Sequence, residues 1–402
     1  MKPFSAQLPN GLEIIAQPMP AARSVAMALV VRVGARDDQN LGAAHFLEHM
    51  LFKGSATYSA LELSSAFDAI GAHANAFTSH ETTTYTASGL PQTQSRLTEL
   101  LLGMMQPRLD VADLDLERQV ILEEIELYRD DPMSIALETS AAQYFLGHPL
   151  GRPVIGTKAS LSSQTKADLQ SHLEQYYSTS NMVLAVCGVF DWQRLLEDAA
   201  EFSQLLPQGQ RNRRHSPDFS PQHGLVRVQH DSTHTHVSLI AKGFAAADQL
   251  ELPAAIAARI IGDSENSRLA WALVDDGTAV SASLEHEGHS ELGAFYGSLE
   301  CRPEHTEQCL ERLGQELTRA KEDGIRESEL ERIKRKLEVG LALRFETPSA
   351  WLGAFSEDYV LQNDLRSPQE VLEELRAVGL IEVNAALEAS GLETPMIVCL
   401  GD

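Results

Sequence analysis

Residues 43–55 read AAHFLEHMLFKGS and place two histidines and a glutamate in the pattern H-x-x-E-H. Apolar residues over 41–52 recur at helical spacing, so we expect a helix here. On a helix His45 and His49 lie one turn apart on the same face, and both imidazoles can reach one metal ion. Glu48 lies beside them, where it can take a proton from a water molecule at that metal. This donor set favours zinc.

A metal-free alternative is a pair of surface histidines next to a carboxylate. The choice depends on a third ligand, and residues 117–132, ERQVILEEIELYRDDP, supply candidates. Glu117 and Glu124 are seven residues apart, so they share a helix face. An inward-facing carboxylate needs a partner, and a metal ion supplies one. We expect Glu123 and Glu126 to be solvated.

The surrounding pattern predicts an α+β fold. Alternating or continuous apolar runs predict strands, and longer runs at helical spacing predict helices. Ser59 with Glu62 forms a capping-box pattern at the start of one helix. The predicted strands are 11–17, 24–34, 74–79, 82–88, 181–189, 225–230, 235–244, 278–285 and 292–300, and the predicted helices are 41–52, 59–70, 92–106, 111–130, 133–146, 251–275, 303–322 and 327–344.

A polar segment with three prolines and two glycines, residues 203–224, interrupts this pattern, and the pattern restarts after it. The two halves also end alike, each with a helix, a turn and an apolar strand that contains a cysteine. We therefore expect two copies of one domain. The predicted division is an N-terminal metal-binding domain over 1–206, a linker over 207–224 and a C-terminal domain over 225–402 without the motif.

The composition is that of a globular protein, with 43% hydrophobic and 22% charged residues. Lys and Arg number 32 against 57 Asp and Glu, a net charge of −25, which argues against binding to nucleic acid or to an anionic membrane. No stretch has the length and hydropathy of a signal peptide or a membrane span. The four cysteines form no CxxC pair, so we expect buried thiols and a cytoplasmic location, or a periplasmic one if a leader precedes the sequence.

With these motifs in place, the sequence resembles the inverted zinc metallopeptidases of the insulinase, pitrilysin and mitochondrial processing peptidase family. The similarity covers most of residues 10–200. It is fainter in the second half. The stretches that carry it are 45–55 HFLEHMLFKGS, 69–88 AIGAHANAFTSHETTTYTAS, 117–132 ERQVILEEIELYRDDP, 148–157 HPLGRPVIGT, 233–244 THTHVSLIAKGF and 266–277 NSRLAWALVDDG.

The resemblance implies roles for individual residues. His45, His49 and Glu124, which follows His49 by 75 positions, correspond to the ligands of one zinc ion per chain. Glu48 corresponds to the catalytic base that activates the zinc-bound water. Glu117 corresponds to a second carboxylate of the catalytic site that supports a ligand. Residues 74–77 (Ala74, Asn75, Ala76 and Phe77) correspond to the edge strand along which substrates bind in extended form.

The resemblance further implies two homologous sandwich-like domains, each a mixed sheet packed with helices, that form half of a clamshell chamber. Family members usually carry an Arg and a Tyr on the C-terminal half to hold the substrate carbonyl. Here Asp276 and Val280 stand at these positions. We therefore expect a heterodimer with a paralogous subunit that carries the Arg and Tyr.

The expected function is zinc-dependent endopeptidase hydrolysis of peptides or unfolded protein segments. A non-catalytic scaffold subunit of a peptidase-like complex is the main alternative, and metal storage or transfer is a third.

The sequence contains two further histidine pairs. His234 and His236 alternate on a predicted strand, where they either bind a second metal or are ordinary strand or interface histidines. His286 and His289 lie in the polar segment EHEGHSE and are expected to be solvated.

Overall fold

The computed structural model describes residues 1–214 and 217–401. Backbone contacts group the chain into two compact units. Unit 1 holds Met1–Ile125, Arg152–His215 and Ala342–Gln369, and unit 2 holds Glu126–Gly151, Ser216–Leu341 and Glu370–Asp402. Each unit has its own mixed sheet, helices and hydrophobic core, which confirms the predicted α+β class.

The sheet of unit 1 has six strands in the order β1-β2-β6-β3-β5-β4. Strand β2 runs parallel to β6, and the other neighbours are antiparallel. β3 and β6 are completely buried, as their apolar sequences predict. The strands are β1 (Phe4–Gln7), β2 (Glu13–Pro18), β3 (Val25–Val31), β4 (His73–Thr78), β5 (Thr83–Gly89) and β6 (Met182–Gly188).

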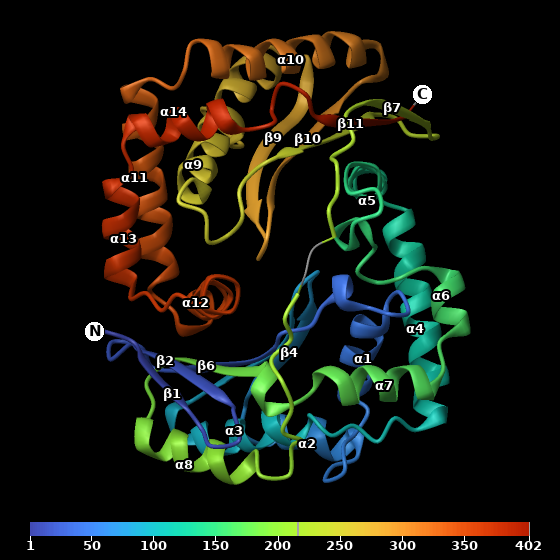
Figure 1. Ribbon diagram of the computed structural model, residues 1–402, viewed down its shortest axis with the longest axis vertical. Coiled ribbons are helices and arrows are strands. Elements are labelled where there is room, and N and C mark those ends of the chain that lie inside the picture. The colour runs from blue at the N-terminus through green and yellow to red at the C-terminus, as the bar shows by residue number, and fades with distance from the viewer. Residues whose placement is uncertain (215–216, 402) are drawn as a thin grey trace. The chain divides into compact units, whose positions relative to one another are not determined.

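Helices cover both faces of this sheet. Figure 1 shows α12 on one face and α3 with α8 on the other. The predicted capping box is present at α2, where Ser59 and Glu62 bond each other's backbone N–H groups. The helices of unit 1 are α1 (Ala43–Leu51), α2 (Ala60–Ala69), α3 (Gln94–Gly103), α6 (Lys158–Ser163), α7 (Lys166–Tyr176), α8 (Trp192–Phe202) and α12 (Pro348–Gln362), and α4 (Val111–Arg129) begins in this unit and ends in the next.

The sheet of unit 2 repeats this order with five strands, β7-β11-β8-β10-β9. Its outer strand β7 is parallel to β11, and the other pairs are antiparallel, as in unit 1 without β1. This shared topology supports the predicted duplication. The strands are β7 (Gly224–Gln229), β8 (Thr235–Lys242), β9 (Ala279–Gly288), β10 (Gly293–Cys301) and β11 (Met396–Gly401).

Helices of unit 2 pack on β8, β9 and β11 and on one another. They are α5 (Pro132–Tyr144), α9 (Glu251–Gly262), α10 (Thr306–Glu322), α11 (Glu327–Arg344), α13 (Pro368–Ala377) and α14 (Leu380–Ala389). The single helix predicted over 251–275 is wrong. Helix α9 ends at Gly262, Asn266 adopts a left-handed φ of 55°, and a turn of π-helix, η5, follows at Ala270–Val274.

Two helices, α5 and α12, belong to a different unit from the half of the sequence in which they occur. α5 comes from the first half of the sequence but packs on β8 and β11, whereas α12 comes from the second half but packs on β3 and β6. These strands are counterparts in the two sheets, so the two units have exchanged equivalent helices. The domain boundaries at 206 and 225 stay a prediction.

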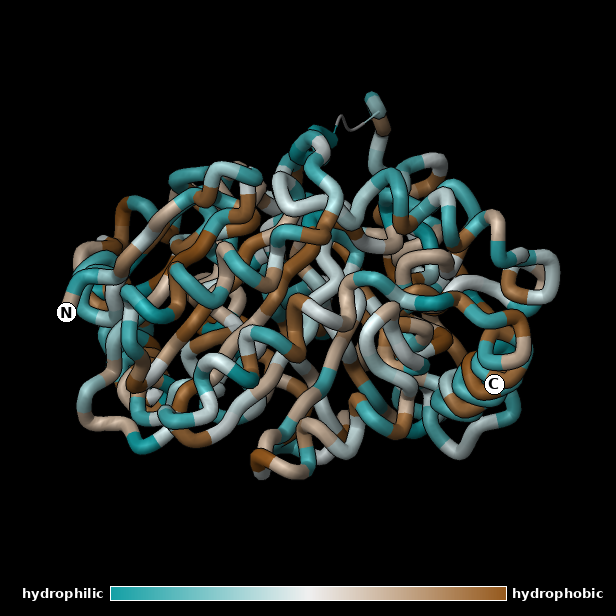
Figure 2. Tube along the Cα trace, turned by 90° about the horizontal axis from the view of Figure 1, so that it is seen from below, coloured by the Kyte–Doolittle hydropathy of each residue, from teal (hydrophilic) through white to brown (hydrophobic). Residues whose placement is uncertain are grey.

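The chain has no long apolar run. Figure 2 shows the hydropathy alternating at short intervals along the trace. Among the described residues, no helix combines the length and the hydropathy that crossing a membrane requires. All four cysteines are buried free thiols, as expected.

Candidate metal centre

Helix α1 presents the H-x-x-E-H residues at one face, next to the middle of α4. His45 and His49 stack edge to face with ring centroids 4.8 Å apart. The Oε2 atom of Glu124 lies 3.9 Å from His45 Nε2 and 3.7 Å from His49 Nε2. One ligand atom from each residue lies within 4.8 Å of the other two. The structure therefore brings the three predicted ligands together.

These residues fit a zinc ion. Ligand atoms of a tetrahedral zinc site lie about 3.4 Å apart, because each is roughly 2.1 Å from the metal. The two distances to Glu124 Oε2, 3.7 and 3.9 Å, are close to this value. Burial, with help from neighbouring His49, lowers the pKa of His45 to about 4. His45 is therefore neutral at pH 7, the form in which imidazole binds a metal.

Glu117 fixes the orientation of His49. Its Oε2 atom lies 3.0 Å from His49 Nδ1, and its Oε1 atom lies 2.7 Å from Lys53 Nζ. A proton on Nδ1 leaves Nε2, the atom that faces Glu124, free to bind a metal. The Glu117 side chain is 4% exposed, and Lys53 supplies a countercharge to this buried carboxylate.

Glu48 is buried beside the histidines and is held by the edge strand. Thr78 Oγ1 donates a hydrogen bond of 2.6 Å to Glu48 Oε2. Burial raises the pKa of Glu48 above its ordinary value, while the Thr78 bond and His49 lower it. The buried hydroxyls of Tyr85 and Tyr177 form a hydrogen bond of 2.9 Å with each other. Burial raises the pKa of both tyrosines, and the negative charge of Glu48 raises it further.

The predicted substrate strand, Ala74–Phe77, lies within β4 at the edge of the sheet. Within residues 1–214 and 217–401, β4 pairs only with β5. Ala76 and Thr78 face the core and Glu48, so alternation turns Asn75 and Phe77 to the opposite face, where Phe77 is 50% exposed. An unpaired edge is the geometry that strand addition needs.

Lys53 and Thr78 were missed by the sequence reasoning. Lys53 lies in the same segment as the motif, four positions after His49, and an i, i+4 relation to a ligand was the available signal. Thr78 lies next to the predicted substrate residues, but its bond to Glu48 depends on how β4 packs on α1, which no spacing indicates.

One prediction about the other histidines is wrong. His286 and His289 are buried rather than solvated. His286 lies on β9, and its Nε2 accepts a hydrogen bond from the Phe244 N–H at 3.0 Å. His234 and His236 both lie near Glu300, but among the described residues they are not part of any group with metal-binding spacing. Glu123 and Glu126 are exposed, as predicted.

Comparison with known proteins identifies similar sequences and structures. The sequence profile of the insulinase family, peptidase family M16, matches residues 13–158, and that of the peptidase M16 inactive domain matches residues 163–337. An uncharacterized zinc protease of Mycobacterium tuberculosis is 32% identical over 396 residues, which cover 96% of this chain and 90% of the relative. One of Bacillus subtilis is 29% identical over 381 residues, which cover 93% and 92%.

Solved structures share the fold. A protease from Helicobacter pylori superposes with a TM-score of 0.90 at 21% identity, covering 99% of both chains. A peptidase M16 inactive domain from Pseudomonas fluorescens gives 0.93 at 18% identity, covering 100% of this chain and 98% of the other. The matched profiles, the sequence relatives and the shared fold show that this chain belongs to the insulinase family, peptidase family M16.

Proposed function

We propose that this chain is a zinc-dependent endopeptidase that hydrolyses peptides or unfolded protein segments. The observation that carries the proposal is the convergence of His45, His49 and Glu124 beside the buried carboxylate of Glu48. The name zinc protease, carried by relatives about 30% identical over nearly the whole chain, supports it.

In this proposal His45, His49 and Glu124 hold the zinc ion. When bound, zinc supplies a Lewis acid that polarises a carbonyl and makes water acidic near neutral pH. Glu48 accepts the proton of the attacking water and returns it to the leaving amine. Its burial favours this role, because a carboxyl with a raised pKa exchanges protons more readily near neutrality. Thr78 fixes one Glu48 oxygen, so the other remains free to bind the water.

Strand β4 would bind the substrate as an added strand. Its free edge offers backbone N–H and C=O groups at Ala74–Phe77, which bond any extended peptide whatever its side chains. Unfolded segments and peptides can adopt this extended form, whereas a folded sheet or helix already uses these backbone groups. This is the physical reason for proposing unstructured substrates.

The rival proposal is a non-catalytic subunit of a larger complex. A chain of complex III from Candida albicans shares the fold with a TM-score of 0.85 at 18% identity, so the fold also occurs within a large assembly. Against this rival, the residues for metal binding and for the base are all present and brought together. A metal-storage protein would also bind zinc, but it would leave Glu48 and its bond to Thr78 without a role.

Two measurements test the proposal on the purified chain. We expect about one zinc per chain by elemental analysis, and chelator-sensitive cleavage of a quenched peptide. Glu48→Gln should keep the zinc and lose the cleavage. Zinc without turnover, both alone and with the partner described next, would favour storage or a scaffold role instead.

We further propose that a paralogous subunit completes the site. Asp276 forms an ion pair with Arg312, whose guanidinium also donates to Ala272 O and Thr278 Oγ1, and Val280 is 55% exposed. Neither side chain at the two positions can donate a hydrogen bond to a substrate carbonyl. Each preorganised donor to a developing oxyanion contributes roughly 10²–10³ in rate, so the chain alone should be slow.

The test is to assay the chain with and without a paralogue that carries the Arg and Tyr. We expect strong activation and a 1:1 complex by light scattering. Full activity of the isolated chain, unchanged by the paralogue, would overturn the partner proposal and leave the peptidase proposal intact.

A further inference from the structure

The connector residues that follow α8 lie against unit 1 as a fixed strap, defined here as residues 209–214. Asn212 accounts for much of this attachment, since its backbone N–H donates to Asn181 Oδ1 at 2.8 Å and its side-chain amide to Asp37 Oδ1 at 3.1 Å. Arg214 pairs with Asp37 at 2.7 Å. A side chain at Gly209 would meet Ser178 Oγ at 2.4 Å, so glycine permits the close approach.

Two guanidinium groups beside the strap share one carboxylate. Glu13, at the start of β2, pairs through Oε2 with Arg32 Nη2 at 2.7 Å and through Oε1 with Arg211 Nη1 at 3.6 Å. Arg213 forms no ion pair or hydrogen bond within the described residues. The local charge is thus about +2, in a chain whose net charge is −25.

Part of this excess positive charge, the guanidinium group of Arg32, is buried rather than exposed to solvent. The residue is 3% exposed, and its Nε and Nη1 atoms are buried with no hydrogen-bond partner in the described part of the chain. Its guanidinium lies 5.9 Å from the ring centroid of Tyr359, on α12. Burial lowers the pKa of Arg32 despite the neighbouring Glu13. Unsatisfied buried N–H groups of a cation cost free energy unless an anion binds them.

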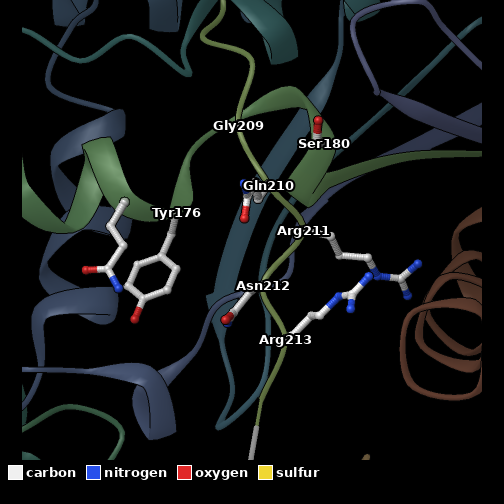
Figure 3. Close-up of a pocket in the computed structure, with 8 residues that line it drawn as sticks. Tyr176, Ser180, Gly209, Gln210, Arg211, Asn212 and Arg213 are labelled. Carbon is white, nitrogen blue, oxygen red and sulfur yellow. The ribbon is translucent and has the colours of Figure 1, made fainter.

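A pocket of about 800 Å³ opens beside the strap and is lined by Arg211, Asn212 and Arg213 and by Tyr176 and Ser180, whereas Arg32 and Glu13 lie behind Arg211 and not in its lining. Figure 3 shows the side chains of Arg211 and Arg213 extending from the strap to the same side, away from Tyr176. Residues i and i+2 of an extended segment point the same way, which explains why the two like charges are adjacent. The volume is within the usual range for a small-molecule site.

We propose that this cluster binds a phosphate group, with Arg211 and Arg213 as its exposed clamp and Arg32 as its buried support. The planar guanidinium forks match the oxygens of phosphate in bidentate geometry. A phosphate dianion neutralises the local charge of about +2, whereas a single carboxylate leaves half of it. The ligand would link the strap to β2, β3 and α12 within unit 1, a site separate from the candidate metal centre.

The experiment measures binding to the full-length, zinc-loaded chain by calorimetry at constant ionic strength, with sodium acetate replacing sodium phosphate. Inorganic phosphate and pyrophosphate are the probes, so that free phosphate and a linked phosphate chain are distinguished. We expect saturable binding of at least one of them, weakened about tenfold by Arg211→Gln or Arg213→Gln and lost in the double variant. Arg213→Lys keeps the charge but not the fork and should fall between.

Arg302→Gln, at an exposed arginine of unit 2, is the matched control and should bind like the wild type. Arg32 is left unchanged because a buried substitution could prevent folding. No saturable binding below about 10 mM, or equal binding by the double variant, would overturn the proposal. Both outcomes are independent of peptide cleavage, which the strap variants should retain.

Discussion

Helices α1 and α9 hold corresponding places in the two units, since each follows the central strand of its sheet, β3 or β8. Their buried residues differ in kind. α1 buries Glu48 among apolar residues and leaves His45 and His49 half-buried, whereas all eight buried residues of α9 are apolar or proline or glycine. The same architecture therefore folds without these polar groups, so they are retained in unit 1 for a reason other than stability.

The edge strands of the two sheets, β4 and β9, also differ in what they contact. β4 ends at Thr78, whose hydroxyl reaches Glu48, and every residue from His73 to Asn75 is exposed. β9, its counterpart, is longer and buries His286 against the N–H of Phe244. One edge is thus tied to the candidate catalytic base, and the other is tied to the core of its own unit.

The largest effect is expected from the ligands. His45→Ala, His49→Ala or Glu124→Ala should each abolish stoichiometric zinc and peptide cleavage together, because two remaining donors leave the site incomplete. Elemental analysis and a quenched-peptide assay measure both. Ile260→Ala in α9 is the control from the other unit: it should lower stability by about 2–5 kcal/mol and leave zinc content unchanged. Full zinc in Glu124→Ala would move the third ligand to another acid, such as Glu123.

The second largest effect is expected from Glu48→Gln. It removes the base and keeps the volume, so we expect kcat to fall roughly 10²–10⁴-fold while zinc stays bound. Thermal unfolding should show equal or higher stability, because a buried carboxylate is replaced by a neutral amide. Turnover near the wild-type rate would remove Glu48 from the mechanism.

Glu117→Gln should have a smaller effect on the metal. Glutamine has one acceptor oxygen, so its NH₂ group must face either the His49 N–H or the Lys53 ammonium, both of which are donors. We expect zinc affinity to fall about 10–100-fold, measured by competition with a chelator. Glu123→Gln, on the same helix but exposed, is the matched control. An unchanged zinc affinity would show that Glu117 does not orient His49.

The smallest effect is expected from Thr78→Val, which removes the hydroxyl but keeps the shape. Loss of one charge-assisted hydrogen bond should lower kcat about tenfold, with KM and zinc content little changed. Thr78→Ser should restore most of the rate. If the serine variant is as slow as the valine variant, the effect arises from packing of β4 and not from the bond to Glu48.

The residues that the sequence assigned to the candidate site lie together in the structure, whereas several of their neighbours were not foreseen. Spacing grouped His45, Glu48 and His49 in one motif and left Glu117 and Glu124 as candidates for the third ligand, and the resemblance to the family selected Glu124. Lys53 and Thr78 act through contacts that tertiary packing creates. His286 was wrongly expected in solvent because its neighbours are polar, and the strand pairing that buries it is not visible in local composition.

The strands and most helices followed from periodicity, and the matching sheet orders bear out the predicted duplication. The exchange of α5 and α12 could not be predicted in this way. Neither helix has a pronounced amphipathic pattern, and nothing in its own sequence indicates which of two similar sheets it will cover. Topology here depends on competition between two homologous surfaces rather than on a local signal.

The exchanged helix α12 has a consequence for how the protein is made. Strand β6 ends at Gly188, and α12 begins at Pro348, 160 positions later. At 5–20 residues per second, a ribosome needs roughly 8–32 s to supply the helix that covers β3 and β6. During that interval the nascent first half exposes one apolar face of its sheet. A chaperone that binds hydrophobic surface, or transient packing of the chain's own α5, would protect this face of the sheet until α12 has been synthesised.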